Sequence, residues 1–464
     1  MAEGITFRDK ALIAGKNGKQ QRWIYPRIIE GRLYKYRSYL SYFLMLALFA
    51  SPFIRLNDEQ LVLLNVLERK FVFFGVVFMP QDFYIFVLAS LTFLVFVILF
   101  TVVFGRVWCG WACPQTIFME MLFRKIENWI EGDAARQKKL NASELTPEKF
   151  FKKTLKHSLF LLISFAIANT FLAYVIGSEA LLKIIREPVQ EHWAGFGSII
   201  AFTLVFYSVF AYVREIVCTV ICPYGRLQGV LLDNKSLVVA FDHKRGDPRG
   251  KRNRKVEDPN KGDCIDCGLC VQVCPTGIDI RNGTQLECIN CTACIDACNM
   301  VMNKLNLPEG LIGFKSQEQL VSRQAFSFGN RIYGYAAILF LLTSVLTVLL
   351  VKRTDIETTI LRASGTLYQE RNDGTVSNLY NAELVNKTSH TINFQLKPVK
   401  SGAKIQFINR ADSLKKGESI KLTFFVIQQK RSIKEYKSNI KLEVTSGEKL
   451  LDKIETTFIA PPNF

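Results

Sequence analysis

The stretch that decides the fold is "CIDCGLCVQVCP", residues 264–275, together with "CINCTACIDACN", residues 288–299. Each run spaces its cysteines C-x2-C-x2-C-x3-C, which is typical of bacterial ferredoxin sites for iron–sulfur clusters. Three closely spaced thiolates can wrap three corners of one cube, while the fourth is displaced and reaches the other cube. The spacing therefore predicts two [4Fe–4S] clusters with crossed ligands. The predicted ligands are Cys264, Cys267, Cys270 and Cys298 for the first cluster, and Cys274, Cys288, Cys291 and Cys294 for the second.

Structural zinc is the main alternative for these eight thiols. Zinc prefers two C-x-x-C knuckles that are well separated in sequence, so two dense runs of four cysteines favour iron–sulfur clusters. The second run has Asn299 where the pattern usually has proline, which weakens the expected turn but removes no ligand. Clusters with crossed ligands offer no open metal site for a substrate. The expected use is therefore one-electron relay.

Five stretches without charged residues predict membrane spans, because a crossing needs about 20 apolar residues. They are 38–54, 83–105, 158–178, 194–213 and 332–351. The first is short and contains Pro52. The run "FVFFGVVFMP" at 71–80 is too short to span, and we expect an interfacial or re-entrant piece there.

The basic residues orient these spans. Residues 1–37 carry nine Lys and Arg, 106–156 carry ten and 214–331 carry sixteen, whereas 55–82 carry three and 179–193 carry two. The positive-inside rule places the first three segments in the cytoplasm. The same bias accounts for the net charge of +18, so we expect a membrane and no nucleic acid as partner.

An odd number of spans sends residues 352–464 to the outside. This tail carries nineteen Lys and Arg, but long domains translocate largely regardless of charge. Its six or seven short, mostly alternating segments are separated by turn residues and predict an immunoglobulin-like β-sandwich. All twelve cysteines lie between Cys109 and Cys298, on the predicted cytoplasmic side, where a reducing compartment keeps thiols free for metals.

The predicted fold is an α-helical membrane protein with five transmembrane helices, an inserted cytoplasmic ferredoxin-like domain and a C-terminal immunoglobulin-like β-sandwich. The expected boundaries are 1–37 for a cytoplasmic N-terminal segment, 38–235 for a membrane domain with four spans, 236–331 for the ferredoxin-like 2x[4Fe–4S] domain, 332–351 for the fifth span and 352–464 for the periplasmic tail.

Two further cysteine pairs, in "GRVWCGWACPQ" (105–115) and "REIVCTVICPYG" (214–225), each follow an apolar stretch and precede a proline. Positions i and i+4 share a helix face, and Pro114 and Pro223 could each begin a new helix. If the second and fourth spans pack together, four thiols meet at the cytoplasmic boundary. Those candidate copper or redox thiols are Cys109, Cys113, Cys218 and Cys222.

Several roles for these four thiols stay open. They could bind a soft ion such as Cu(I), hold a further cluster, or cycle between dithiol and disulfide. The structural alternative is that buried cysteines pack as small hydrophobic residues.

Other side chains near the spans have simpler expected roles. The segment "QTIFMEMLFRKIENWI" at 115–130 predicts an amphipathic helix lying at the membrane interface, with Trp129 on its apolar side. Arg106 and Arg214 are expected to be positive-inside anchors. The four histidines show no metal-ligand spacing and are expected at polar surface or boundary positions.

Taken together, these motifs resemble the cytochrome c oxidase accessory protein family called CcoG, FixG or RdxA. The likeness rests on "GRVWCGWACPQTIFMEMLFRKIENWIEGD", "REIVCTVICPYGRLQ", "FDHKRGDPRG" and the two ferredoxin runs, with "YPRIIEGRLYKYR" near the N-terminus. The resemblance implies a bacterial inner-membrane protein that acts in assembly of cbb3-type cytochrome c oxidase. It implies an oxidoreductase that reduces Cu(II) to Cu(I), with oxidase subunits or copper chaperones as partners and copper as a possible further metal.

Two other functions stay open at this point. Related membrane quinol dehydrogenases share the same cysteine motifs, so the chain could relay electrons from quinol to a periplasmic reductase. A non-enzymatic assembly scaffold, whose tail recruits oxidase subunits, is the third possibility. The sequence does not identify the electron donor.

Overall fold

The structure is a computed structural model that describes residues 23–56, 59–67, 69–78, 82–251, 261–363, 365, 367–388, 390–399, 402–433 and 435–462. Residues 1–22 of the predicted N-terminal segment lie outside the described residues. The chain divides into two compact units. The first consists of Met1–Ser51, Ala89–Ala173 and Glu179–Thr343, and the second of Pro52–Leu88, Tyr174–Ser178 and Ser344–Phe464.

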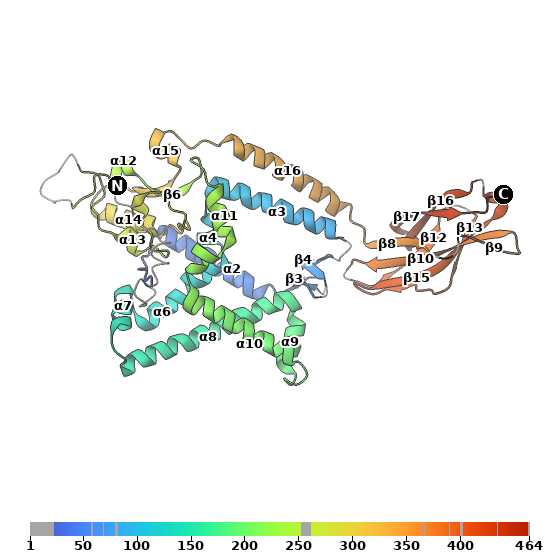
Figure 1. Cartoon of the computed structure of the whole chain (residues 1–464), viewed down its shortest axis with the longest axis horizontal. Coiled ribbons are helices and arrows are strands. Elements are labelled where there is room, and N and C mark those ends of the chain that lie inside the picture. Colours follow the sequence, from blue (N-terminus) through green and yellow to red (C-terminus); the bar gives the residue numbers. More distant parts are fainter. Residues whose placement is uncertain are drawn as a thin grey trace. The chain divides into compact units, whose positions relative to one another are not determined.

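Four helices among the described residues are long and apolar enough to cross a membrane. They are α3 (Phe83–Phe104), α8 (Pro147–Ile176), α10 (Trp193–Ser208) with its continuation η3 (Val209–Val213), and α16 (Asn330–Val351) (Figure 1). A helix of 22 residues such as α3 is about 33 Å long, which suffices for a hydrocarbon core of about 30 Å. Large apolar side chains such as Phe93 and Phe340 are exposed on them, as expected for helices that contact lipid. These helices match the last four predicted spans.

Helix α2 (Arg32–Ala50) covers most of the first predicted span, 38–54, but is not among the four apolar helices. Its buried residues are the polar Arg37, Ser38 and Ser41. The Asp296 carboxylate caps its first turn and accepts hydrogen bonds from the backbone N–H groups of Leu33 (3.2 Å) and Tyr34 (2.7 Å). A membrane crossing by this helix stays a prediction.

The segment before α3 forms strands. Strands β1 (Arg55–Leu56) and β2 (Glu59–Gln60) pair, and β3 (Val62–Asn65), β4 (Lys70–Phe73) and β5 (Val76–Phe78) form an antiparallel sheet. Leu63, Val72 and Val77 share its small core. Residues 71–78 are thus a β-hairpin, and an interfacial or re-entrant position for the run at 71–80 stays a prediction. Gly75 (φ +79°) makes the turn that folds this apolar run into a hairpin.

The predicted helix at 115–130 is present, and its place at a membrane interface stays a prediction. It consists of α5 (Pro114–Ile117), η2 (Phe118–Phe123) and α6 (Arg124–Glu131). The ring of Phe123 lies 4.7 Å from that of Phe160 in α8 and 4.4 Å from that of Phe210 in η3, centroid to centroid. The apolar side of this helix thus packs against other helices, and Trp129 is exposed.

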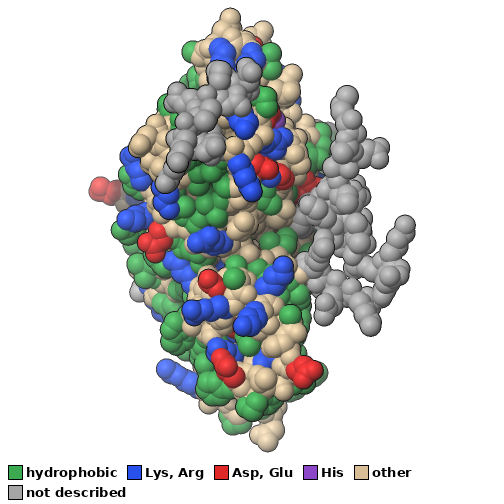
Figure 2. Space-filling view, turned by 90° about the vertical axis from the view of Figure 1, so that its left-hand side faces the viewer, with side chains coloured by type: hydrophobic (Ala, Val, Ile, Leu, Met, Phe, Trp, Pro, Cys, Tyr) green, Lys and Arg blue, Asp and Glu red, His purple; other side chains and the backbone are tan. Residues whose placement is uncertain are grey.

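The cysteine-rich part of the first unit surrounds a short ladder between β6 (Val238–Phe241) and β7 (Ile312–Lys315). Its helices and turns are α12 (His243–Gly246), α13 (Leu269–Gln272), η5 (Ile280–Asn282), α14 (Ala293–Lys304) and α15 (Gln317–Ser322). The remaining helices of the unit are α4 (Val107–Trp111), α7 (Ala134–Ala142), α9 (Ser178–Arg186), η4 (Val217–Ile221) and α11 (Pro223–Leu231). Figure 2 shows the face that carries this cysteine-rich part, where Lys and Arg side chains are more frequent than Asp and Glu.

The tail contains two β-sheets. The larger has the order β13 (Ala403–Phe407), β15 (Ser419–Gln429), β10 (Thr375–Asn386) and β8 (Ile356–Arg362), with β9 (Gln369–Glu370) on β10. The smaller has the order β12 (Gln395–Pro398), β16 (Lys437–Ser446) and β17 (Lys449–Ile459), while β11 (Ile392–Asn393) pairs with β14 (Ser413–Leu414). Alternate residues such as Phe424 and Leu442 from both sheets fill one core. The buried amide of Asn378 joins the sheets by exchanging hydrogen bonds with the backbone of Ile459. This is the expected immunoglobulin-like arrangement.

A buried ion cluster lies within the second unit. Asp82 is fully buried and accepts from Arg353 (2.7 Å) and Lys387 (2.6 Å). Lys387 also contacts Glu357 (2.6 Å). The residue that precedes α3 is thereby tied to the chain that follows α16.

Candidate metal centre

A first cavity is lined by cysteines from both ferredoxin runs. They are Cys264, Cys267, Cys270 and Cys298. The loop before α13 supplies the first two, α13 the third and α14 the fourth. Phe241, Met302 and Leu311 are among its apolar lining residues, and Arg281 adds one positive charge to the lining.

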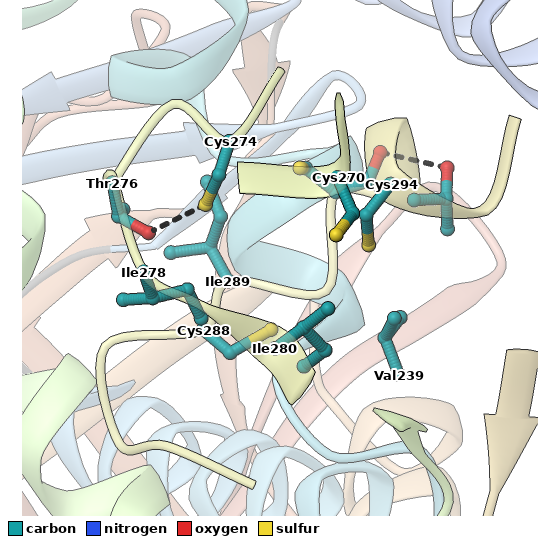
Figure 3. Close-up of a pocket in the computed structure, with 11 residues that line it drawn as sticks. Val239, Cys270, Cys274, Thr276, Ile278, Ile280, Cys288, Ile289 and Cys294 are labelled. Carbon is teal, nitrogen blue, oxygen red and sulfur yellow. Dashed lines mark hydrogen bonds between the residues drawn. The ribbon is translucent and has the colours of Figure 1, made fainter. Parts of the chain in front are cut away.

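A second cavity is shown in Figure 3. Its cysteines are Cys270, Cys274, Cys288, Cys291 and Cys294. Val239, Ile278 and Ile280 supply apolar walls, and the Cys274 thiol lies 3.3 Å from the Thr276 hydroxyl. Cys270 lines both cavities, which are therefore neighbours.

The fourth cysteine of each run lines the cavity of the other run. Cys294 and Cys298 are one turn apart on α14, yet they line different cavities. Cys274 likewise leaves the first run for the cavity of the second. Positions i and i+4 share one face of a helix, so α14 runs past both cavities. Crossed ligation requires this distribution.

The two cysteine loops repeat one backbone conformation. Asp266 (φ 54°) and Gly268 (φ 65°) flank the second cysteine of the first run. Asn290 (φ 52°) and Thr292 (φ 66°) occupy the matching positions of the second run. The left-handed region suits Gly, Asn and Asp, whereas a β-branched residue such as Thr is strained there. The strained Thr292 shows how strongly this loop shape is imposed.

The residues of both cavities fit iron–sulfur clusters. Burial raises the pKa of the Cys270 thiol to about 11 and that of Cys288 to about 12. Because a raised pKa disfavours the thiolate, metal binding must provide the driving force for deprotonation. Cysteine lines both cavities, whereas His, Asp and Glu are absent among the described residues that line either one. Sulfur is therefore the only ligand type there among these four side-chain types. The described residues bring three such ligand atoms within 4.8 Å of one another only at Glu187, Glu191 and His192. A tetrahedral zinc with bonds of about 2.3 Å would hold its sulfurs about 3.8 Å apart, so the wider thiol spacing favours a larger group.

The other four cysteines lie where α4 and η4 end. Cys113 and Cys222 precede the helices α5 and α11, and Pro114 and Pro223 are the first residues of those helices. Proline suits this position because its missing N–H has no partner to lose there. Cys109 is buried, and the other three thiols are half-buried.

Two arginines near these thiols are not the membrane anchors that we expect from the sequence. Arg106 is 3% exposed and donates to the backbone carbonyls of Leu286 and Cys218, the latter at 3.5 Å. Arg214 is 6% exposed and forms a two-bond ion pair with Glu127 at 2.8 and 3.0 Å. Charge counting misses such residues because it treats every basic side chain near a span alike.

A second feature that sequence reasoning missed is a surface group of metal-ligand side chains, formed by Glu187, Glu191 and His192. Glu187 contacts His192 and lies 3.8 Å from Lys183. These surface charges are partly balanced among themselves, and no ligand site is assigned to them.

Comparison with known proteins agrees with this description. Three family models match: "4Fe-4S binding domain" at residues 86–139, "4Fe-4S dicluster domain" at 213–317 and "IG-like fold at C-terminal of FixG" at 346–461. Protein RdxB of Cereibacter sphaeroides is 32% identical over 80% of this chain and 81% of its own length. Protein RdxA of the same organism is 32% identical over 80% of this chain and 81% of its own length.

Nitrogen fixation protein FixG of Rhizobium meliloti is 33% identical over 71% of this chain and 63% of its own length. The long matches to RdxA and RdxB, the iron–sulfur family models and the FixG-type tail show that this chain is a membrane iron–sulfur electron-transfer protein of the FixG/RdxA family.

Proposed function

We propose that this chain is a membrane-bound one-electron relay that holds two [4Fe–4S] clusters in its ferredoxin-like part. Cys264, Cys267, Cys270 and Cys298 would hold one cluster, and Cys274, Cys288, Cys291 and Cys294 the other. The observation that carries the proposal is that these eight thiols line two adjoining cavities that share Cys270. When bound, such clusters accept and donate single electrons.

The chain's own residues give these sites buried apolar walls, while the Cys267 thiol is exposed. Val239, Ile280 and Met302 are at most 2% exposed and form part of the cavity walls. Low exposure to solvent is one of the factors that set cluster potentials. With every cluster iron assigned a cysteine, no ligand position is left for a substrate.

We further propose that the iron–sulfur part lies in the cytoplasm and the tail in the periplasm, with the predicted boundaries 1–37, 38–235, 236–331, 332–351 and 352–464. Five spans across the bacterial inner membrane would sort the segments in this way. Support comes from the charge counts, because 106–156 and 214–331 are far richer in Lys and Arg than 55–82 and 179–193. The loop at 55–82 falls in the same unit as the tail, whereas 179–193 falls in the other unit.

The electron acceptor that we propose is Cu(II), which would be reduced to Cu(I) for insertion into a cbb3-type oxidase. This step consumes one electron per copper ion and needs a donor to the clusters. The proposal rests on the family, and it includes oxidase subunits or copper chaperones as partners. The cavities themselves favour electron transfer without naming its acceptor.

Crossed ligation gives a sharp test of the relay. In anaerobically purified full-length protein, Cys264→Ala and Cys298→Ala should remove the same electron paramagnetic resonance signal. Cys274→Ala and Cys288→Ala should together remove the other. If the changes instead group by run, so that Cys298→Ala resembles Cys288→Ala, the proposed ligand sets are wrong.

The acceptor is tested with the same variants. Protein reduced beforehand should convert Cu(II) to Cu(I), as followed with a Cu(I)-specific chelator, and the cluster variants should be slower. Unchanged copper reduction in variants that have lost both clusters would refute the cupric activity. Reduction of the clusters by a quinol analogue, without any copper reduction, would identify the quinol relay instead.

A further inference from the structure

The four thiols outside the ferredoxin runs form one group, called here the boundary thiols: Cys109, Cys113, Cys218 and Cys222. The two motifs that supply them meet directly. The Cys109 thiol lies 3.0 Å from the Oε1 atom of Gln228 in α11, the helix that follows the second motif. Arg106, just before the first motif, donates to the Cys218 carbonyl (3.5 Å). Segments about 110 positions apart in the chain thus share one site.

All four boundary thiols are shielded from full contact with solvent. Cys109 is buried and the other three are half-buried. A Cβ atom added to Gly225, three residues after Cys222, would lie 2.7 Å from the Arg106 guanidinium and 2.9 Å from the Cys218 carbonyl oxygen. The two cysteine pairs therefore belong to one packed region of the molecule.

Among the described residues, the boundary thiols do not bring three sulfurs close enough together for one tetrahedral ion. In the described part of the chain, no three cysteine sulfurs lie within 4.8 Å of one another, here or in the two cavities. Four thiolates on a single tetrahedral ion with bonds of about 2.3 Å would stand about 3.8 Å apart. A cube of four irons, with one thiolate on each, holds its ligands farther apart. The geometry therefore favours a cluster over one copper or zinc ion.

The surroundings can compensate the negative charge of such a group. Arg106 is 3% exposed, and its Nε has no hydrogen-bond partner among the described residues. It is also the basic side chain that lowers the pKa of Cys109 against the effect of burial. A buried guanidinium with an unused donor beside four thiols fits an anionic ligand.

The boundary thiols also adjoin the second ferredoxin run. Cys109 shares a small buried cluster with Ile289 and Cys291. Trp111 donates to the Asn290 carbonyl (3.3 Å). The family model for 4Fe-4S binding at residues 86–139 includes Cys109 and Cys113 but ends before Cys218.

From these observations we propose that Cys109, Cys113, Cys218 and Cys222 bind a third [4Fe–4S] cluster, beside the proposed cluster of the second run. All twelve cysteines of the chain would then be ligands. This goes beyond the proposed two-cluster relay and does not depend on copper as its acceptor.

The test is the iron and acid-labile sulfide content of full-length protein purified without oxygen. Three clusters require about twelve iron and twelve sulfide per chain, and two clusters about eight of each. We expect the wild type near twelve and Cys109→Ala and Cys222→Ala near eight, a 1.5-fold decrease. Thr170→Val, a buried and nearly isosteric change in α8, is the matched control and should stay at twelve.

The outcomes separate this proposal from the relay. Wild-type protein with eight iron and eight sulfide overturns the third cluster and leaves the relay intact, and this result needs no variant to fold. Eight iron with one stoichiometric copper or zinc that is lost in Cys109→Ala would identify a single-ion site and also overturn the proposal. Protein without sulfide would refute the relay itself.

Discussion

Gly110→Ala tests the contact between the first boundary-thiol motif and the second ferredoxin run. Gly110 lies in α4, one residue after Cys109. A Cβ atom added there would lie 2.4 Å from the carbonyl oxygen of Ile289 and 2.9 Å from the backbone nitrogen of Cys291. Both are backbone atoms and cannot rotate away. The two segments would have to separate by roughly 1 Å, since van der Waals contact between such atoms needs about 3.5 Å.

The magnitude follows from two opposing effects. Overpacking of a well-packed interior costs about 1–3 kcal/mol. Replacing glycine by alanine inside a helix returns up to about 1 kcal/mol. Gly334→Ala in α16 is the matched control, because nothing lies within 4 Å of its added Cβ and the helix effect is similar. The difference between the two variants therefore isolates the clash, and we expect about 1–3 kcal/mol.

Thermal unfolding of the full-length protein in one detergent measures this difference. At about 2 °C per kcal/mol for a large domain, Gly110→Ala should unfold several degrees below Gly334→Ala. Faster loss of iron to a chelator should accompany the shift, because the strained contact includes Cys291. An unfolding midpoint for Gly110→Ala at or above that of Gly334→Ala would refute the close contact and, with it, the placement of the third cluster beside the second ferredoxin run.

Three further changes probe the rest of the chain. Asp296→Ala removes the cap of α2 and should destabilise the protein by about 1 kcal/mol, seen as a lower unfolding midpoint that Asp296→Asn partly restores. Burial opposes ionisation of Asp82, but hydrogen bonds from Arg353 and Lys387 outweigh it and lower the pKa of the carboxyl. The stabilisation that this ionised carboxyl gives the folded protein is therefore fully present above the unfolded-state pKa of about 3.9. It is lost as the pH falls below that pKa. Between about pH 5 and about pH 3 the midpoint should fall more for wild type than for Asp82→Asn. Asn378→Leu leaves the backbone groups of Ile459 buried and unpaired at a cost of about 2–4 kcal/mol, which hydrogen exchange of the β17 amides should reveal as reduced protection.

Local patterns in the sequence predicted much of this fold. Long stretches of sequence without charged residues are enough to predict α3, α8, α10 and α16, because a lipid-facing helix tolerates few charges along its whole length. Strand alternation likewise predicts the sandwich of the tail. The hairpin at 71–78 was missed because an apolar aromatic run suits both a membrane and a small sheet, and β8 (356–362) because its residues barely alternate. In both cases the strand conformation depends on the neighbouring strands with which the segment pairs, and these are not visible in the local sequence.

Some features of the candidate site could likewise be predicted from local sequence, and others could not. The ferredoxin spacing points to the eight cavity cysteines, since ligand reach is a local property of the chain. The burial of Arg106 and Arg214 depends on partners more than 80 positions away, and no local pattern reveals it. The left-handed conformation of Thr292 does have a signal: it occupies the position of Gly268 when the two runs are aligned.

The departure at Asn299, where the sequence pattern usually has proline, follows from the helix that holds the cysteines. Pro275 comes after α13 has ended at Gln272, so its missing N–H is harmless. Asn299 lies inside α14, which continues to Lys304 and places the buried Met302 in the lining of the first cavity. A proline there would remove a backbone hydrogen bond in the turn that positions Cys298, and it would clash with the preceding turn. The Asn299 side chain also accepts from the Gly310 amide at 3.0 Å. The two runs therefore share ligand spacing but not the element that follows, because the second run must also supply the helix on which both cavities are built.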